Sequence, residues 1–258
     1  MSDVHGLSGA IRLQFQIVTR DRSYLNEIVA NPFFAVIFLG VVKAAGREDL
    51  AIFALVAPVL MTLWGMALEI SGDVVDYDRS AGIIEGGVAT PTPLSVVVVG
   101  RVLTVSILSV VAVAETWLVA RFAFRMAVSV EHPVLLVATL GATSLAMTGT
   151  ALVMAAAFVL ARSARTYQNT LNYPIYLLSG VLVPISFLPE WLRPVSRCLF
   201  LSWSADLMRD SLRPDSVDDV VLRLTVILLL GLAGFVAGRI LLQRVVHRVR
   251  QLGTLGFQ

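Results

Sequence analysis

The sequence is poor in the residues that build most catalytic and metal-binding sites. It contains one cysteine, Cys198, so the chain forms neither an internal disulfide nor a cysteine metal cluster. The three histidines, His5, His132 and His247, lie far apart and argue against a histidine metal site. No Walker A loop, GxSxG elbow or HExxH pattern is present. We therefore expect a chain that is not an enzyme and that holds no metal and no cofactor of its own.

Charge is also scarce, and this decides the class of protein. Asp, Glu, Lys and Arg make up 15% of the residues, whereas soluble domains have about 25%. Hydrophobic residues make up 57%, and the mean hydropathy is +0.82. The net charge of +2 is too small to indicate a nucleic-acid partner. The composition predicts a membrane protein, because a core of this size cannot hide so much apolar surface.

Six stretches are apolar enough to be candidate membrane spans. They cover residues 32–45, 50–75, 95–120, 134–161, 170–183 and 220–242. Asn31 is placed to cap the first span, with Pro32 in its first turn. An even number of spans puts both termini on one side, and the arginines concentrated in the two tails place that side in the cytoplasm. The prediction is an all-α polytopic membrane protein, in which residues 1–258 form a single transmembrane domain with six transmembrane helices.

Two segments outside the spans have patterns of their own. Residues 5–29 are amphipathic and predict an N-terminal interfacial helix; a helix packed on other protein remains the alternative. Residues 184–219 alternate apolar and polar groups, and repeated prolines interrupt them. Trp191 and Trp203 are typical of a membrane interface. We expect an outer re-entrant or interface-lying helical hairpin before the last span, with short helical pieces at 189–199 and 204–212.

Few ionisable residues fall inside the spans. Glu69 and Asp73 lie late in the second span, Glu115 lies in the outer part of the third, and Arg101 lies near an inner helix end. Glu69 and Glu115 are candidates for a substrate or proton site. Placement at the interface, or a polar bond to a neighbouring helix, is the alternative. The nearly charge-free middle of the other spans argues against a proton relay or an ion pore and fits an amphipathic or lipid-like cargo.

One polar stretch between the second and third spans carries a family resemblance. The sequence DYDRSAGIIEGGVATPTPLSVVVVGRVL, Asp76 to Leu103, resembles the signature of type-2 ABC exporter permeases, the drug, lipid and polysaccharide group. In that group an acidic-Arg pair, a Gly, an acid, a Thr-Pro-Leu-Ser run and a Gly-basic pair follow one another. The matching residues here are Asp78, Arg79, Gly82, Glu85, Thr90, Pro91, Gly100 and Arg101.

A second block, NYPIYLLSGVLVPISFLPEWLRPVS, resembles the fifth span and outer hairpin of the same family. The residues that match are Pro174, Ser179, Gly180, Pro184, Leu188, Pro189 and Trp191. Asp206 and Arg209 resemble the Asp-x-x-Arg that follows in the family. The two blocks stand in the family's order around the expected spans.

The resemblance implies an assembly. Two permease chains, as a homodimer or a heterodimer, would join two separate ATP-binding cassette ATPase subunits that hold ATP and Mg, in the inner membrane of a bacterium and in contact with membrane lipid. Residues 76–94 would form the cytoplasmic coupling helix, with Glu85 offering its charge to the ATPase and Pro91 stopping the helix. A simple polar loop is the alternative. Gly86 and Gly87 depart from the family pattern, and each costs about 1 kcal/mol in a helix interior.

By the same analogy, the substrate pathway would run along the second and fifth spans. The expected pathway residues are Met61, Trp64, Glu69, Glu115, Tyr173 and Tyr176. Ordinary helix packing is the alternative for the aromatic and Met positions. The function expected is the transmembrane permease subunit of an ATP-driven exporter for a drug-like, lipid or glycan substrate. An ion-coupled carrier using Glu69 and Glu115, or a membrane scaffold that transports nothing, are the alternatives.

Overall fold

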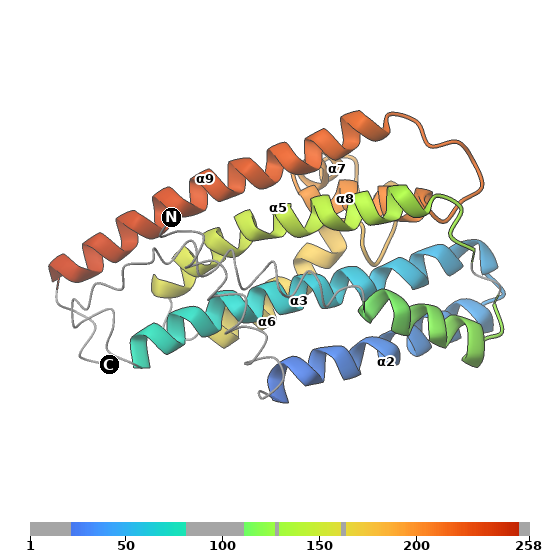
Figure 1. Ribbon diagram of the computed structural model, residues 1–258, viewed down its shortest axis with the longest axis horizontal. Helices are drawn as coiled ribbons and strands as arrows, with labels where there is room; N and C mark the ends of the chain where they lie inside the picture. Colours follow the sequence, from blue (N-terminus) through green and yellow to red (C-terminus); the bar gives the residue numbers. More distant parts are fainter. Residues whose placement is uncertain (1–21, 81–110, 127–128, 161–163, 253–258) are drawn as a thin grey trace.

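The structure is a computed structural model that describes residues 22–80, 111–126, 129–160 and 164–252. Within these ranges the chain is helical and contains no strand. The elements are α2 (Arg22–Ala44), η1 (Glu48–Leu50), α3 (Ala51–Ser80), a helical stretch at 111–118 that ends in the π-helical turn η2 (Val119–Ala123), α5 (Pro133–Leu160), α6 (Ala164–Leu178), η3 (Ile185–Phe187), α7 (Arg193–Arg197), α8 (Phe200–Asp210) and α9 (Val220–Leu252). The long helices α2, α3, α5 and α9 run roughly along one axis (Figure 1).

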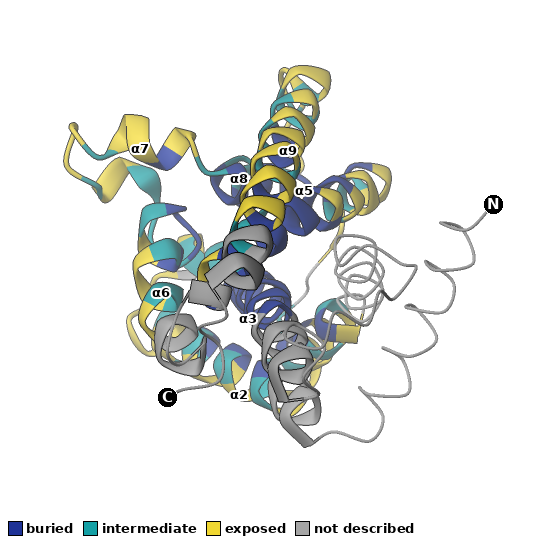
Figure 2. Ribbon diagram, turned by 90° about the vertical axis from the view of Figure 1, so that its left-hand side faces the viewer, coloured by how far each residue is buried: buried dark blue, intermediate teal, exposed yellow. Residues whose placement is uncertain are grey.

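Helix α3 lies at the centre of the bundle, where it contacts α2, α5, α6 and α8. Its side chains between Ala54 and Leu68 are buried. Figure 2 shows the buried residues gathered on α3, α5 and α8, while the outward face of α9 is exposed. α3 is apolar on every side through this stretch, so burying it takes several neighbouring helices and not just one.

Three helices in the described part are long and apolar enough to cross a membrane. The crossing segments are Ala51–Leu68 in α3, Pro133–Phe158 in α5 and Val220–Val245 in α9, and α2 adds the shorter apolar stretch Val29–Ala44. These helices support an integral all-α membrane protein. The count of six stays a prediction, because residues 95–110 of the third span are outside the described part and α6 is short.

Helices α5 and α9 approach each other closely at several glycines. A Cβ atom added to Gly149 would lie 2.2 Å from the carbonyl oxygen of Gly231. One added to Gly231 would lie 2.4 Å from the Cα of Ala146, and one added to Gly238 would lie 2.7 Å from the Cβ of Leu152. Small residues therefore let the two backbones touch, as is common where helices associate inside a bilayer.

The start of α2 corrects one expectation. The helix begins at Arg22 and continues through Asn31 and Pro32, so Asn31 is not a cap and Pro32 is inside the helix. Asn31 is 0% exposed and uses its side chain for contacts with other helices. The sequence misled us because an Asn that caps a helix and an Asn that bonds across helices look alike. Residues 22–29 of the expected interfacial helix belong to α2, and residues 5–21 lie outside the described part.

The other helix bounds differ from the expected spans mainly at their ends. α5 begins and ends close to the expected 134–161, whereas α3 continues past residue 75 to Ser80 and α9 continues past residue 242 to Leu252. α6 starts before residue 170 and ends at Leu178, short of the expected residue 183.

Gly180 explains the early end of α6. It has φ +71°, a left-handed conformation that glycine adopts readily. Its N–H donates to the carbonyl of Leu177, and the Val181 N–H donates to the carbonyl of Tyr176. This pair of bonds is a Schellman motif, which terminates an α-helix.

Candidate functional site

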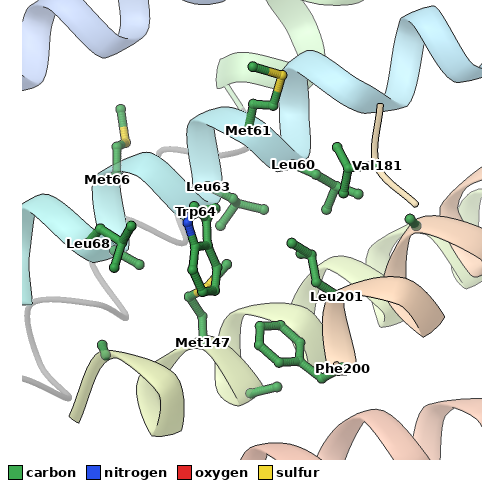
Figure 3. Close-up of a cluster of buried hydrophobic side chains, with 14 of the residues drawn as sticks. Leu60, Met61, Leu63, Trp64, Met66, Leu68, Met147, Val181, Phe200 and Leu201 are labelled. Atoms are coloured by element: carbon green, nitrogen blue, oxygen red, sulfur yellow. The ribbon is translucent and has the colours of Figure 1, made fainter. Parts of the chain in front are cut away.

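Three of the expected pathway residues are buried inside the chain. Trp64 is 3% exposed, and its indole N–H donates to the side-chain oxygen of Asn172 at 3.1 Å. Tyr176 is 4% exposed, and its hydroxyl donates to the backbone carbonyl of Met61 at 3.1 Å. In Figure 3, Trp64 points from α3 towards Met147 of α5. The contacts of Met61, Trp64 and Tyr176 are therefore those of helix packing within one chain, and their part in a pathway stays a prediction.

Tyr173 is placed differently from these three. It is 65% exposed and meets Tyr176 edge-on, with ring centroids 6.5 Å apart. It is thus the one aromatic ring of the expected set that faces outward in the described structure. Glu69 lies on α3 just past the apolar segment Ala51–Leu68, in a part of the helix where the structure describes the backbone only.

Glu115 belongs to a polar cluster formed by three helical segments. The Asn31 amide of α2 donates to the Glu115 carboxylate at 3.1 Å and to the backbone carbonyl of Ala112 at 3.1 Å. The same amide nitrogen lies 3.3 Å from the Thr116 hydroxyl. From α3, the Thr62 hydroxyl donates to the Asn31 side-chain oxygen at 3.2 Å. Asn31, Thr62 and Thr116 are buried, whereas Glu115 is half-buried and reaches the surface of the chain.

Sequence reasoning singled out Glu115 but missed the residue that holds it. Asn31 was assigned to a helix end, although a single amide within an apolar stretch is itself a signal for interhelical bonding. The contacts join residues more than 80 positions apart, so no local pattern predicts them.

The outer hairpin is built around short helices and side-chain bonds to the backbone. Pro184 precedes η3 in an extended conformation, and Pro189 separates η3 from the turn that leads to α7. The Arg193 guanidinium donates to the carbonyls of Leu188 and Ser186 at 3.2 and 3.1 Å, which closes this loop. Trp191 at its tip is 74% exposed, as a residue at a membrane interface would be.

Helix α8 is more buried than an interface-lying helix would be. Most of its residues are inside, and it contacts α3, α5 and α9. Phe200 and Leu201 join the core cluster beside Leu60 and Val181 (Figure 3). The hairpin therefore packs α8 into the bundle and leaves α7 at the surface, and its place relative to the membrane stays a prediction.

Arg209 connects α8 to two other elements. It is 3% exposed, and its terminal nitrogen donates to the carbonyls of Gly180 at 2.5 Å and Val181 at 3.1 Å. Its guanidinium lies 4.1 Å from the ring centre of Phe53 on α3, a cation–π distance. Burial lowers the pKa of Arg209 to about 10, so the side chain keeps its charge at neutral pH.

Asp206 supplies the counter-charge in this region. Its carboxylate lies 3.4 Å from Arg209 and 2.8 Å from Arg197, whose guanidinium stacks over Trp203. The Trp203 indole N–H donates to the Arg197 carbonyl at 2.9 Å. The Asp-x-x-Arg pair therefore joins the buried and the exposed halves of the hairpin.

A polar cavity of about 230 Å³ opens where the hairpin leads into α9. It is lined by Asp210, Arg213, Asp215, Ser216, Val217, Asp218 and Arg223. The Arg223–Asp210 ion pair at 2.7 Å closes one wall. His132 connects the cavity region to the loop before α5, because its backbone N–H donates to Ser211 and its ring contacts the Asp215 carbonyl. Both arginines of the lining pair with Asp210, which connects the end of α8 to the start of α9.

The expected coupling segment lies mostly outside the described residues. Asp78 and Arg79 are in the last turn of α3. Gly82, Glu85, Gly86, Gly87, Thr90 and Pro91 all fall within 81–110 and are not described.

A comparison with protein families matches residues 8–212 to the ABC-2 type transporter model. The match begins before α2 and ends just after α8, and so it covers most of the chain. The chain belongs to the ABC-2 type transporter family. Among curated proteins, no relative matches it.

The family places the chain as the membrane-spanning permease subunit of an ABC transporter. Permeases of this family associate with ABC ATPase subunits, and this fits a chain without a nucleotide-binding loop. The match ends before α9, yet α9 packs against α5 more extensively than any other described pair of helices does. In this ABC-2 permease, α9 therefore packs as part of the same helix bundle.

Proposed function

We propose that this permease is the membrane half of an ATP-driven exporter. Two permease chains and two ATPase subunits would move an amphipathic drug-like molecule, lipid or glycan out of the cytoplasm of a bacterium. The observation that carries the proposal is the ABC-2 family match over residues 8–212. Both termini would lie in the cytoplasm, as the arginines concentrated in the two tails of the sequence favour.

The length of α3 supports the proposed coupling through residues 76–94. Its apolar segment, Ala51–Leu68, has 18 residues, and such a segment spans about 27 Å at 1.5 Å per residue, close to the thickness of the hydrocarbon. The helix then continues to Ser80, which adds about 18 Å on the cytoplasmic side. A movement of the following segment would therefore reach the buried centre of the bundle through one continuous helix.

The nature of the buried polar groups supports an amphipathic cargo. Among the residues whose side chains the structure describes, Arg209 is the one buried charged residue, and the other buried polar residues are Asn31 and a set of serines and threonines. A proton relay or an ion pore uses chains of ionisable side chains in the bundle interior. The described buried polar side chains are mostly hydroxyl groups instead, and such an interior is compatible with an amphipathic molecule.

The test is transport by the purified permease with its ATPase in sealed vesicles. We expect export of a fluorescent amphiphile that requires ATP and continues after the ion gradients are collapsed. Glu85→Arg and Gly87→Trp, both in the coupling segment, should reduce ATP-driven export at least about tenfold. Asp49→Arg is the matched control, because Asp49 is an exposed carboxylate in the loop at the opposite end of α3.

Two results contradict the proposal. Transport that persists without ATP and stops when the gradients collapse would point to an ion-coupled carrier. Coupling variants that export like the Asp49→Arg control would remove residues 76–94 from the energy pathway.

A further inference from the structure

The carboxyl group of Glu115 lies deep within the proposed membrane region. It is eight positions before Ala123, the last residue of η2, and this spacing corresponds to about 12 Å below the outer end of that segment. Its partner Asn31 lies 13 positions before Ala44, the last residue of α2, and is therefore further from the outer end of its helix than Glu115 is from the end of its own segment. Thr62, which donates to Asn31, is well inside α3. An ionisable group at such a depth is costly and commonly marks a substrate site.

The surrounding side chains fix the position of this carboxyl group. The Asn31 oxygen accepts from Thr62, and the Asn31 nitrogen donates to Ala112 and to one Glu115 oxygen. The amide thus uses its acceptor and its donors, so it has little freedom to rotate. Asn31 is a positioning residue that holds Glu115 in one orientation, and pre-orientation of this kind is what a binding group needs.

The charge of Glu115 is not balanced within the described part of the chain. The ion pairs found there lie in the loop before α3 and in the outer hairpin region, and none includes Glu115. On the same helical face, Val111 and Leu118 are 41% and 45% exposed. A carboxylate on an apolar surface therefore meets a molecule that carries both a positive charge and an apolar body.

We propose that Glu115 binds the ammonium group of an amphipathic amine as the molecule passes through the exporter. This inference rests on the proposed export function and names the substrate class that the site selects. The carboxylate oxygen to which no described residue donates receives the ammonium group, and the surface around Val111 and Leu118 receives the apolar part. Either a free cationic amphiphile or the amine headgroup of a lipid presents this chemistry.

Binding is measured with the assembled exporter in nanodiscs made of phosphatidylglycerol. The probes are 8-(dansylamino)octylamine, which keeps one free ammonium group, and its N-acetylated, uncharged analogue. Glu115→Gln keeps an oxygen that accepts from Asn31 and removes the charge. We expect it to weaken binding of the amine at least about tenfold and to leave the neutral analogue unchanged, since hydrogen bonds to charged groups are the strong ones. Glu131→Gln, at an exposed carboxylate in the loop before α5, is the matched control and should change neither probe.

Two further arms complete the test. Asn31→Ala should lower the ratio of amine to neutral affinity several-fold, whereas a purely structural residue would lower both affinities together. Adding phosphatidylethanolamine to the nanodiscs should compete with the amine probe if the lipid headgroup is the natural ligand, and should leave it unchanged if a free amphiphile is.

The inference is overturned if Glu115→Gln binds the amine as well as the unchanged protein does, or if it weakens both probes equally. Retained binding of the neutral analogue shows that the variant is folded. Because binding is measured without ATP, this outcome is separate from the export function, which is tested by ATP-driven transport in vesicles.

Discussion

Replacing Arg209 with Met tests whether the outer hairpin is held to the bundle by this side chain. The substitution removes two hydrogen bonds from a charged donor, to Gly180 and Val181, the 3.4 Å contact with Asp206, and the cation–π contact with Phe53. Hydrogen bonds of this type contribute about 1.5–3 kcal/mol each, and a desolvated cation–π contact contributes about 2 kcal/mol. Part of this gain offsets the cost of burying the guanidinium in the unchanged protein.

The expected net loss is about 3 kcal/mol, in line with the effect of removing one partner of a buried ion pair. For a chain of this size the loss lowers the melting temperature by about 5–10 °C. Arg213→Met is the control, because Arg213 is near the surface and lies 3.7 Å from Asp210, too far for a strong ion pair. Its effect should stay below about 1 kcal/mol.

The single cysteine gives a local measurement to accompany the melting curve. Cys198 is exposed and lies between α7 and α8. A spin label attached to it reports on the hairpin, and no other cysteine has to be removed first, because the chain has only this one. We expect Arg209→Met to increase the mobility of the label and Arg213→Met to leave it unchanged. The reasoning is refuted if the two variants melt together and give the same spectra.

Further predictions concern the glycines and the polar cluster. Gly149→Leu should prevent the permease from eluting as a monodisperse species in size-exclusion chromatography, because the new Cβ would meet backbone atoms of α9. Gly141→Leu is the control on the same helix: a side chain there meets open space, so this variant should elute like the unchanged protein. Gly180→Ala should destabilise the protein by about 2 kcal/mol more than Gly46→Ala in thermal melts; both glycines have positive φ, but only Gly180 would also meet Ile185. Thr62→Val should lower stability by about 1–2 kcal/mol, because it leaves the buried Asn31 oxygen without its donor, and Thr225→Val, at an exposed hydroxyl, should have little effect.

The parts of the fold that the sequence predicted best are those set by length and hydropathy. An apolar run that starts at a proline was enough to predict α5, and its observed bounds, Pro133–Leu160, are close to the predicted 134–161. The end of α6 was harder, because its apolar run continues past Gly180 while the backbone turns there. Gly180 itself was the available signal, because a glycine often ends a helix. The apolar residues on both sides of it favoured a continuous helix instead.

Contacts across the sequence account for most of what was missed. The Asp-x-x-Arg pair indicated that Arg209 matters, but its partners Gly180, Val181 and Phe53 come from other elements and follow from packing alone. Asn31 shows the same limit more sharply, since the local pattern predicted a cap and the structure uses the residue between helices. Asp78 and Arg79, which were expected from the family motif, lie in the last turn of α3. The structure describes no contact of their side chains, so their role in coupling stays a prediction.

The contact between α5 and α9 has a consequence for how the protein is made. Gly149 of α5 leaves the ribosome well before Gly231 and Gly238 of α9, so its side of α5 meets lipid or the insertion machinery until α9 arrives. This face of α5 is therefore covered only after α9 has been made. A nascent chain stopped at residue 212 would contain every residue of the family match and would still lack the helix that packs against α5.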